Sequence, residues 1–335
     1  MHQESQDGPN LPGLAVPFPL RINPHVDTAR HHDMAWAKGT GLVSTPADEL
    51  RYRSWDLALL VAGWLPDAPP DGVDLAVNAF NWCTVYDDLH AGERATDSRY
   101  ARRMAEPVLT YLETGHLPRN PTPLLLALDD IVTREMQRSP HESHARIAHN
   151  WALFVAAFME ETKNREGGLP LSYHEYRALR MESGAVPLMT DLVEIANGYH
   201  VTAGARSVPA FQTLFNSANE AICYINDLYS YPKEEAAGDQ HNLVFVFENA
   251  HRCTRQEAVG RTVEAILDAC DNMLLQQSRL RNGCRRAKLP PEEIAGAHRF
   301  SHDLIYPISS MVSWQQKSGR YARPDNAVYK SGLHR

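Results

Sequence analysis

The stretch AICYINDLYSYPKE (221–234) begins as an apolar helical pattern and ends in polar residues at a regular spacing. Asn226, Ser230 and Glu234 recur at every fourth position. A four-residue step turns an ideal α-helix by about 400°, so the three side chains share one face. The residues before Asn226 are apolar nearly all round, which is typical of a buried helix. Because buried oxygens need partners, we predict a metal site here, in preference to a polar face turned to solvent.

Two further residues of this stretch shape the prediction. Pro232 cannot donate a hydrogen bond to the carbonyl of Leu228, so the helix is expected to bend or break there. Lys233 follows directly, and its compact ammonium charge suits a phosphate. The stretch thus places a cation for phosphate beside the oxygen ligands.

A second pair of acids ends the stretch AFNWCTVYDDL (79–89), which is apolar and aromatic. Carboxylate oxygens suit Mg2+, which needs only one or two protein carboxylates when phosphate oxygens and water complete its shell. Asp87 and Asp88 are therefore candidate ligands. The alternative is a helix end whose acids face water, and the acid pair taken alone does not decide between the two.

Helical patterns dominate the rest of the chain, and alternating runs bounded by turns are nearly absent. We therefore predict an all-α protein of about ten helices in one domain. Residues 1–24, which are rich in Pro and Gly, are expected to form an arm on its surface. The helices are predicted over 49–65, 74–89, 122–139, 144–165, 172–183, 186–198, 208–231, 254–286 and 291–317, with a capping box at Ser172 and Glu175.

Composition limits the classes of function. The 335 residues carry a net charge of -8, which disfavours general binding of nucleic acid. An anionic substrate would therefore have to be met by metal cations or a local basic pocket. No apolar run approaches a membrane span, the N-terminus lacks a signal-peptide pattern, and the five cysteines show no paired spacing. We expect a cytoplasmic protein without stable membrane insertion.

In their order along the chain, these features resemble the bacterial class I terpene synthases (terpene cyclases). PFPLRINPH (17–25) is similar to the N-terminal arm of that family, and FNWCTVYDDLH (80–90) to its aspartate-rich motif. NDLYSYPKE (226–234) resembles its Asn/Ser/Glu triad with the following Lys-Glu pair, and GDQHNLV (238–244) the stretch after it. The resemblance covers nearly the whole chain.

The resemblance also extends to single residues whose spacing to the motifs matches the family. Arg180 lies 46 residues before Asn226, where the family keeps an arginine that senses diphosphate. Ser183 and Gly184 then fall at its linker and effector positions. Near the C-terminus, the Arg320-Tyr321 pair and Trp314 match an Arg-Tyr pair and a cavity aromatic.

The resemblance implies a helical domain over residues 25–321 around a central apolar cavity, followed by a tail (322–335). It implies three Mg2+ ions held between Asp87 and the Asn226, Ser230 and Glu234 triad. Its implied substrate is a linear isoprenyl diphosphate, with the Gly184 carbonyl polarising the bond that breaks. The diphosphate would be bound by Arg180, Lys233, Arg320 and Tyr321.

The cavity of such an enzyme must be dry, and aromatic faces stabilise a cationic carbon. The family register assigns this role to Phe80 and Trp314. For Phe154 and Tyr224 we favour plain core packing. The histidines show no zinc-binding spacing, so none is assigned as a ligand.

One departure concerns the aspartate motif, whose third acid is replaced by Ala91 or Gly92. Asp87 is expected to suffice as chief ligand. Whether Asp88 or Glu93 contacts metal, or instead pairs with Arg320, is left open by the sequence.

Three functions are weighed. Cyclisation of farnesyl diphosphate is favoured, with geranylgeranyl diphosphate a close second. Prenyl transfer normally calls for two aspartate-rich motifs, and here the second cluster is Asn/Ser/Glu. A catalytically silent helical binding protein is supported only by the missing third acid. A homodimer is compatible with such a fold, although no specific feature of the sequence requires one.

Overall fold

The computed structural model describes residues 13–168 and 170–320, which form fifteen α-helices, one short 3-10 helix (Gly92–Arg94) and no strand. The all-α class is thus confirmed. The helices are α1 (Val26–Thr40), α2 (Pro46–Trp55), α3 (Leu57–Trp64), α4 (Pro70–Leu89), α5 (Ser98–Thr114), α6 (Pro123–Arg138), α7 (His141–Gly167), α8 (Tyr173–Ser183), α9 (Val186–Ala196), α10 (Ala203–Arg206), α11 (Pro209–Ala237), α12 (Leu243–His251), α13 (Arg255–Arg286), α14 (Pro291–Asp303) and α15 (Ile305–Gln315).

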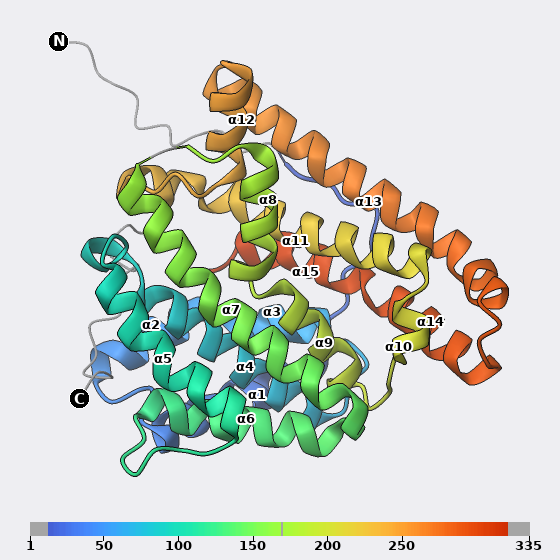
Figure 1. Ribbon diagram of the computed structural model, residues 1–335, viewed down its shortest axis with the longest axis horizontal. Coiled ribbons are helices and arrows are strands. Elements are labelled where there is room, and N and C mark those ends of the chain that lie inside the picture. The colour runs from blue at the N-terminus through green and yellow to red at the C-terminus, as the bar shows by residue number, and fades with distance from the viewer. Residues whose placement is uncertain (1–12, 169, 321–335) are drawn as a thin grey trace.

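The helices surround α4, which is buried along most of its length. In Figure 1, α7 crosses the front of the molecule and α13 runs along one edge, with α11 beside it on the inner side. α11 packs along α13, while α4 contacts α1, α3, α6 and α9. Within the described ranges no helix is both long and apolar enough to span a membrane. The arrangement leaves α4 and α11 as two walls of the interior.

The described part of the N-terminal arm packs against the helices. Phe18 is buried, and the Asn23 amide donates to the carbonyls of Leu65 (2.7 Å) and Ala68 (2.9 Å). Nearby, His25 and His32 each hydrogen-bond a different oxygen of Asp74, which joins α1 to α4. These contacts hold the first helix and the arm against the end of α3 and the beginning of α4.

The single helix predicted over 49–65 is two helices, α2 and α3, and this prediction is therefore wrong. The break lies at Asp56, whose φ of 48° is left-handed. Arg30 donates to both carboxylate oxygens of Asp56 at 2.8 Å, which stabilises a conformation that costs an ordinary residue roughly 1–3 kcal/mol. The stretch 291–317 is likewise divided, into α14 and α15 at Leu304.

A bend or a break was expected at Pro232, and the break does not occur, because α11 continues to Ala237. Proline removes one donor, and the helical hydrogen bonds around it are enough to carry the helix through. It ends instead at Gly238, whose φ of 72° is left-handed. There the N–H of Asp239 donates to the carbonyl of Glu234 (2.9 Å), as in a helix C-cap. Glu234 thus lies in the last turns of a continuous helix.

Candidate active site

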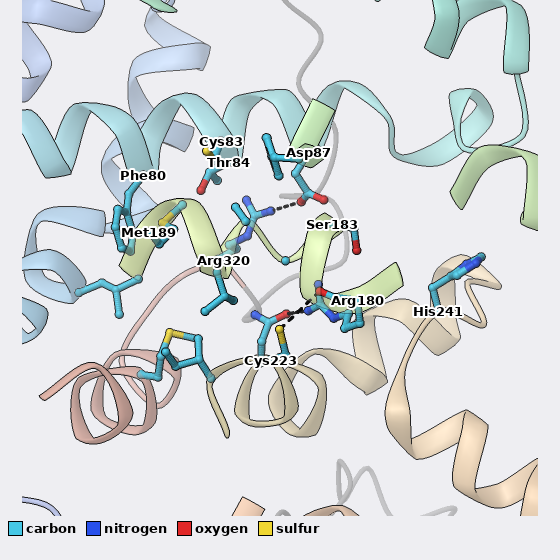
Figure 2. Close-up of a pocket in the computed structure, with 18 of the residues that line it drawn as sticks. Phe80, Cys83, Thr84, Asp87, Arg180, Ser183, Met189, Cys223, His241 and Arg320 are labelled. Atoms are coloured by element: carbon cyan, nitrogen blue, oxygen red, sulfur yellow. Dashed lines mark hydrogen bonds and ion pairs between the residues drawn. The ribbon is translucent and has the colours of Figure 1, made fainter. Parts of the chain in front are cut away.

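A cavity of about 200 Å3 lies between α4 and α11, and α3, α7, α8, α9 and α15 complete its wall. Figure 2 shows Phe80, Cys83, Thr84 and Asp87 along α4 on one side, and Cys223 on the other. The Phe80 ring meets that of Trp64 edge to face, with centroids 4.9 Å apart. The apolar lining consists of Leu57, Leu60, Trp64, Phe80, Phe154, Val186, Met189, Ile222, Met311 and Trp314.

Charged and polar residues gather around the same cavity. They come from the C-terminal end of α4, from α7, α8 and α11, from the loop after α11, and from the segment after α15. The cavity therefore has an apolar wall and a charged one. The charged and amide residues are Asp87, Glu161, Arg165, Arg180, Asn226, Lys233, Glu234, Asp239, His241 and Arg320.

The structure brings Asn226 and Glu234 to this charged wall, as the spacing predicted. Ser230 is buried one turn away and is not one of the lining residues. Asn242, which sequence reasoning missed, connects Ser230 to Glu234. Its amide donates to Glu234 Oε2 (2.8 Å) and to Ser230 Oγ (3.4 Å). Burial, with the charges of Asp239 and Asp227, raises the pKa of Glu234 to about 7. A cation would stabilise its ionised form.

The aspartate pair is held by Arg320, which is one of the alternatives that the sequence left open. Arg320 Nη2 lies 2.6 Å from Asp87 Oδ2 and 2.9 Å from Asp88 Oδ1. Asp87 lines the cavity, whereas Asp88 is buried beside it and Glu93 is exposed outside the lining. Burial raises the pKa of Asp88 despite the nearby charge of Arg320.

The carboxylate of Asp88 is close to a cation without being hydrogen-bonded. Both oxygens are buried, and the contact of Oδ1 with Arg320 at 2.9 Å is an ion pair that lacks the geometry of a hydrogen bond. A buried carboxylate in this state is costly. A second cation near Asp87 and Asp88 would relieve that cost.

Arg180 occupies the opposite side of the charged wall. Its Nη2 donates to Asn226 Oδ1 (2.7 Å), and its Nε donates to Asp227 Oδ1 (3.0 Å). Burial alone would lower the pKa of Arg180, but the negative charge of Asp227 raises it well above its ordinary value. The guanidinium is therefore a fixed positive charge. Asp227 was missed by sequence reasoning, although an acid within an otherwise apolar helical run was a usable signal.

Gly184 fits its site because it has no side chain. A Cβ there would lie 2.9 Å from both the Arg180 carbonyl oxygen and Cys223 Sγ. α8 ends at Gly184, and the next residue, Ala185, has a left-handed φ of 56°. Pro187 has no N–H, and nothing in the described ranges donates a hydrogen bond to the Gly184 carbonyl. That carbonyl is therefore available to a ligand.

The aromatic assignments divide in the structure. Phe80 and Trp314 line the cavity, and Trp314 Nε1 donates to the carbonyls of Trp55 (2.7 Å) and Asp56 (3.1 Å). Phe154, for which packing was favoured, lines the cavity as well as packing in the core. Tyr224 is absent from the lining and is within hydrogen-bonding distance of Tyr173. Tyr321 and the tail (322–335) lie outside the described residues.

A salt-bridge network borders the charged wall and was also missed. Arg165 lies 3.0 Å from Glu161 and 2.8 Å from Asp239. The His241 ring and backbone both contact Asp239 Oδ1, and with Arg165 they lower the pKa of that carboxyl despite its burial. The network fixes the loop between α11 and α12 against α7.

Comparison with known proteins agrees with this arrangement. Residues 78–272, more than half of the chain, match the family described as "Terpene synthase family 2, C-terminal metal binding". The chain belongs to the terpene synthase family. The matched range contains the aspartate pair, Arg180 and the triad.

Curated relatives cover most of this terpene synthase. Pentalenene synthase of Streptomyces avermitilis is 27% identical over 92% of each chain. (+)-T-muurolol synthase ((2E,6E)-farnesyl diphosphate cyclizing) of Roseiflexus castenholzii is 33% identical over 75% of this chain and 77% of its own. The crystal structure of α-eudesmol synthase superposes with a TM-score of 0.81 over 91% of this chain and 99% of that one; at 24% identity it shows the fold alone. The protein is a class I terpene synthase, a lyase that acts as a terpene cyclase.

The residues present fit the divalent metal that the family description implies. Asp87, Asn226 and Glu234 present two carboxylates and an amide oxygen to one cavity, and Ser230 adds a hydroxyl within a turn. Oxygen ligands of this kind suit hard cations. Burial raises the pKa of Glu234, and the Asp88 carboxylate is buried beside Asp87, so a cation bound here would stabilise the ionised form of both groups.

Proposed function

We propose that this terpene synthase cyclises farnesyl diphosphate to a sesquiterpene hydrocarbon or alcohol with release of diphosphate. The observation that carries the proposal is one cavity with an aromatic wall and a charged wall. The first suits an isoprenyl chain, and the second suits a diphosphate. The (+)-T-muurolol synthase relative, whose name states that it cyclises farnesyl diphosphate, supports this substrate. Geranylgeranyl diphosphate, giving a diterpene, is the second candidate.

We propose that Asp87 holds Mg2+ from α4 and that Asn226, Ser230 and Glu234 hold it from α11, with three ions in all. Bound Mg2+ neutralises the charge that builds up on the leaving diphosphate. The two sets of oxygen ligands lie on different helices, α4 and α11, at the charged wall of one cavity, so metal and diphosphate would lie between them. Asp88 supports the site by its charge beside Asp87.

Arg180, Lys233 and Arg320 would bind the diphosphate from the protein side. Arg180 donates a hydrogen bond to Asn226, and Arg320 pairs with the aspartates, so each guanidinium is already positioned at the charged wall. Burial and the neighbouring charge of Arg320 lower the pKa of Lys233, and a bound diphosphate would favour its charged form. Tyr321 is proposed to donate one further hydrogen bond to the diphosphate.

The Gly184 carbonyl is proposed to face the allylic end of the substrate and to favour positive charge there as the carbon–oxygen bond breaks. Phe80 and Trp314 then contact the cationic chain through their rings. Because Trp314 Nε1 is hydrogen-bonded outside the cavity, its polar atom is directed away from the cation. Trp64 packs on Phe80 and helps to exclude water.

We assign the reaction to residues 25–321, with 1–24 as an arm and 322–335 as a tail. A cytoplasmic location is proposed, since the five cysteines are free thiols, as in a reducing compartment. Prenyl transfer is less favoured, because α11 supplies an amide and a hydroxyl where a second aspartate-rich motif would supply carboxylates. The proposal needs no second copy of the chain.

Incubation of the purified protein with farnesyl or geranylgeranyl diphosphate and Mg2+, followed by gas chromatography–mass spectrometry, tests the proposal. A cyclic sesquiterpene from the first substrate is the expected result. A cyclic diterpene from the second substrate alone would change the substrate and keep the reaction. Linear products of longer chain, formed when isopentenyl diphosphate is added as the acceptor, would indicate prenyl transfer, and no product from either substrate would refute the proposed function.

A further inference from the structure

We propose that Asp227 is the positioning residue that holds Arg180 for the reaction, and that Tyr176 in turn fixes Asp227. This inference rests on the proposed function, in which Arg180 binds the diphosphate. Asp227 follows Asn226 in α11 but does not line the cavity. Its part is therefore to orient a cavity residue, without contact with substrate.

Every oxygen of the Asp227 carboxylate has a defined partner. Oδ1 accepts from Arg180 Nε at 3.0 Å, whereas Oδ2 accepts from the Tyr176 hydroxyl and from the Leu243 N–H at 3.2 Å. The residue has no exposed surface. The carboxylate thus joins α8, α11 and the first residue of α12, and it cannot rotate without breaking at least two hydrogen bonds.

The two ends of the Arg180 guanidinium differ in what they contact. Nε is bound to the buried Asp227, while Nη2 contacts Asn226, which lines the cavity. A diphosphate can replace Asn226 at Nη2 and leave the Nε bond in place. The planar fork of arginine then keeps its direction, because one edge stays fixed while the other changes partner.

Ser183 occupies the position that the resemblance assigns as the linker of Arg180, but its side chain does not hydrogen-bond Arg180. Its hydroxyl is buried, and no hydrogen-bond partner for it occurs among the residues that the structure describes. Around Arg180, α8 is joined to α11 by Asp227, by Asn226 and by Cys223, whose thiol donates to the Arg180 carbonyl at 3.5 Å. Residues of α11 itself therefore hold Arg180 in place, and Ser183 does not.

A double-mutant cycle tests this inference by calorimetry of Mg2+-dependent binding of inorganic diphosphate, which needs no turnover. Asp227→Asn is expected to weaken diphosphate binding at least tenfold in the otherwise unchanged protein. In an Arg180→Lys background, which lacks the Nε–H donor, it is expected to weaken binding less than twofold. Effects that simply multiply would overturn the inference, because independent residues give additive free energies.

A milder variant covers the case in which Asp227→Asn does not fold. Tyr176→Phe keeps the charge of Asp227 and removes one donor, so it is expected to weaken diphosphate binding at least threefold, and again only in the presence of Arg180. An equal effect in the Arg180→Lys background would count against the inference. Ser183→Ala is expected to show no coupling to Arg180→Lys.

Asp191→Asn is the matched control. Like Asp227, Asp191 is buried, pairs with arginine (Arg146 and Arg206) and does not line the cavity. Unlike Asp227, it does not contact Arg180. Its loss is expected to lower stability without coupling to Arg180→Lys. Failure of the unmodified protein to convert any isoprenyl diphosphate would refute the proposed function instead, and it is seen before the cycle is measured.

Discussion

Gly184→Ala is the smallest change that tests the site, because it adds one methyl group between α8 and α11. The new Cβ would lie 2.9 Å from the Arg180 carbonyl oxygen and from Cys223 Sγ, and 3.3 Å from Arg180 Nη1. Ordinary van der Waals contact begins at 3.4 Å, so the first two neighbours must each be displaced by 3.4 - 2.9, or 0.5 Å. Only Cys223 Sγ belongs to α11, whereas the two Arg180 atoms belong to α8, so relief requires both a shift at Cys223 and a distortion of the last turn of α8.

The backbone itself does not oppose this substitution. Gly184 has φ -71° and ψ -3°, which alanine adopts freely, so the cost is steric. Overpacking of a core typically costs about 1–3 kcal/mol, which leaves a folded protein. Misplacement by about 1 Å can lower the rate on the order of 100-fold, so half that displacement of Arg180 and the Gly184 carbonyl is expected to lower kcat by about tenfold.

Steady-state kinetics of diphosphate release, with circular dichroism and thermal unfolding, measure both effects. Gly260→Ala is the control, since a Cβ at that position in α13 meets nothing within 4 Å. We expect it to stabilise the helix by up to about 1 kcal/mol and to leave kcat unchanged. A Gly184→Ala enzyme with wild-type kcat would refute the role given to the Gly184 carbonyl and to the spacing of α8 from α11.

Three further predictions address the metal site and the core. Asn226→Ala or Glu234→Ala is expected to reduce turnover below detection with an unchanged helical circular dichroism spectrum; full activity in either variant would return the triad to the status of a polar face. Chelation with EDTA is expected to abolish turnover, and Mg2+ to restore it, whereas activity that survives EDTA would exclude the proposed metal. Burial raises the pKa of Glu135 to about 8, so its folded form keeps a proton that the unfolded chain loses above about pH 4.5. Stability is therefore lost as pH rises from about 4.5 to 8, and at pH 7 the loss is about 3 kcal/mol, from 1.36 kcal/mol per pKa unit. Glu135→Gln retains an acceptor for Trp151 Nε1 and should remove this pH dependence in urea unfolding; an unchanged pH dependence would show that Glu135 does not cause it.

The helical class and half of the site could be predicted because they depend on local periodicity. Asn226 and Glu234 recur at helical spacing after an apolar run, and that spacing alone places them on one face of a buried helix. The capping box at Ser172 and Glu175 is local in the same way, and the structure confirms it.

What the sequence did not show depends on contacts between distant segments. Asp56 has no local reason to adopt a left-handed conformation, and the break there reflects Arg30 from another helix. The roles of Asp227 and Asn242 likewise depend on α8 and α12 packing beside α11. The continuation of α11 through Pro232 shows the converse case, in which a local rule is outweighed by the helix on either side.

The corner between α2 and α3 joins residues early in the chain to residues 314–319 and so bears on the order of folding. The Trp55 carbonyl accepts from Trp314 and from Ser318, and the Gly319 N–H donates to the Ser54 carbonyl. Arg320 comes next, 233 residues after the aspartate that it contacts. At about 5–20 residues per second, a ribosome adds Arg320 roughly 12–47 s after Asp87. During that interval Asp87 and Asp88 cannot pair with Arg320, so the charged wall of the cavity is the part of this enzyme expected to consolidate last during synthesis.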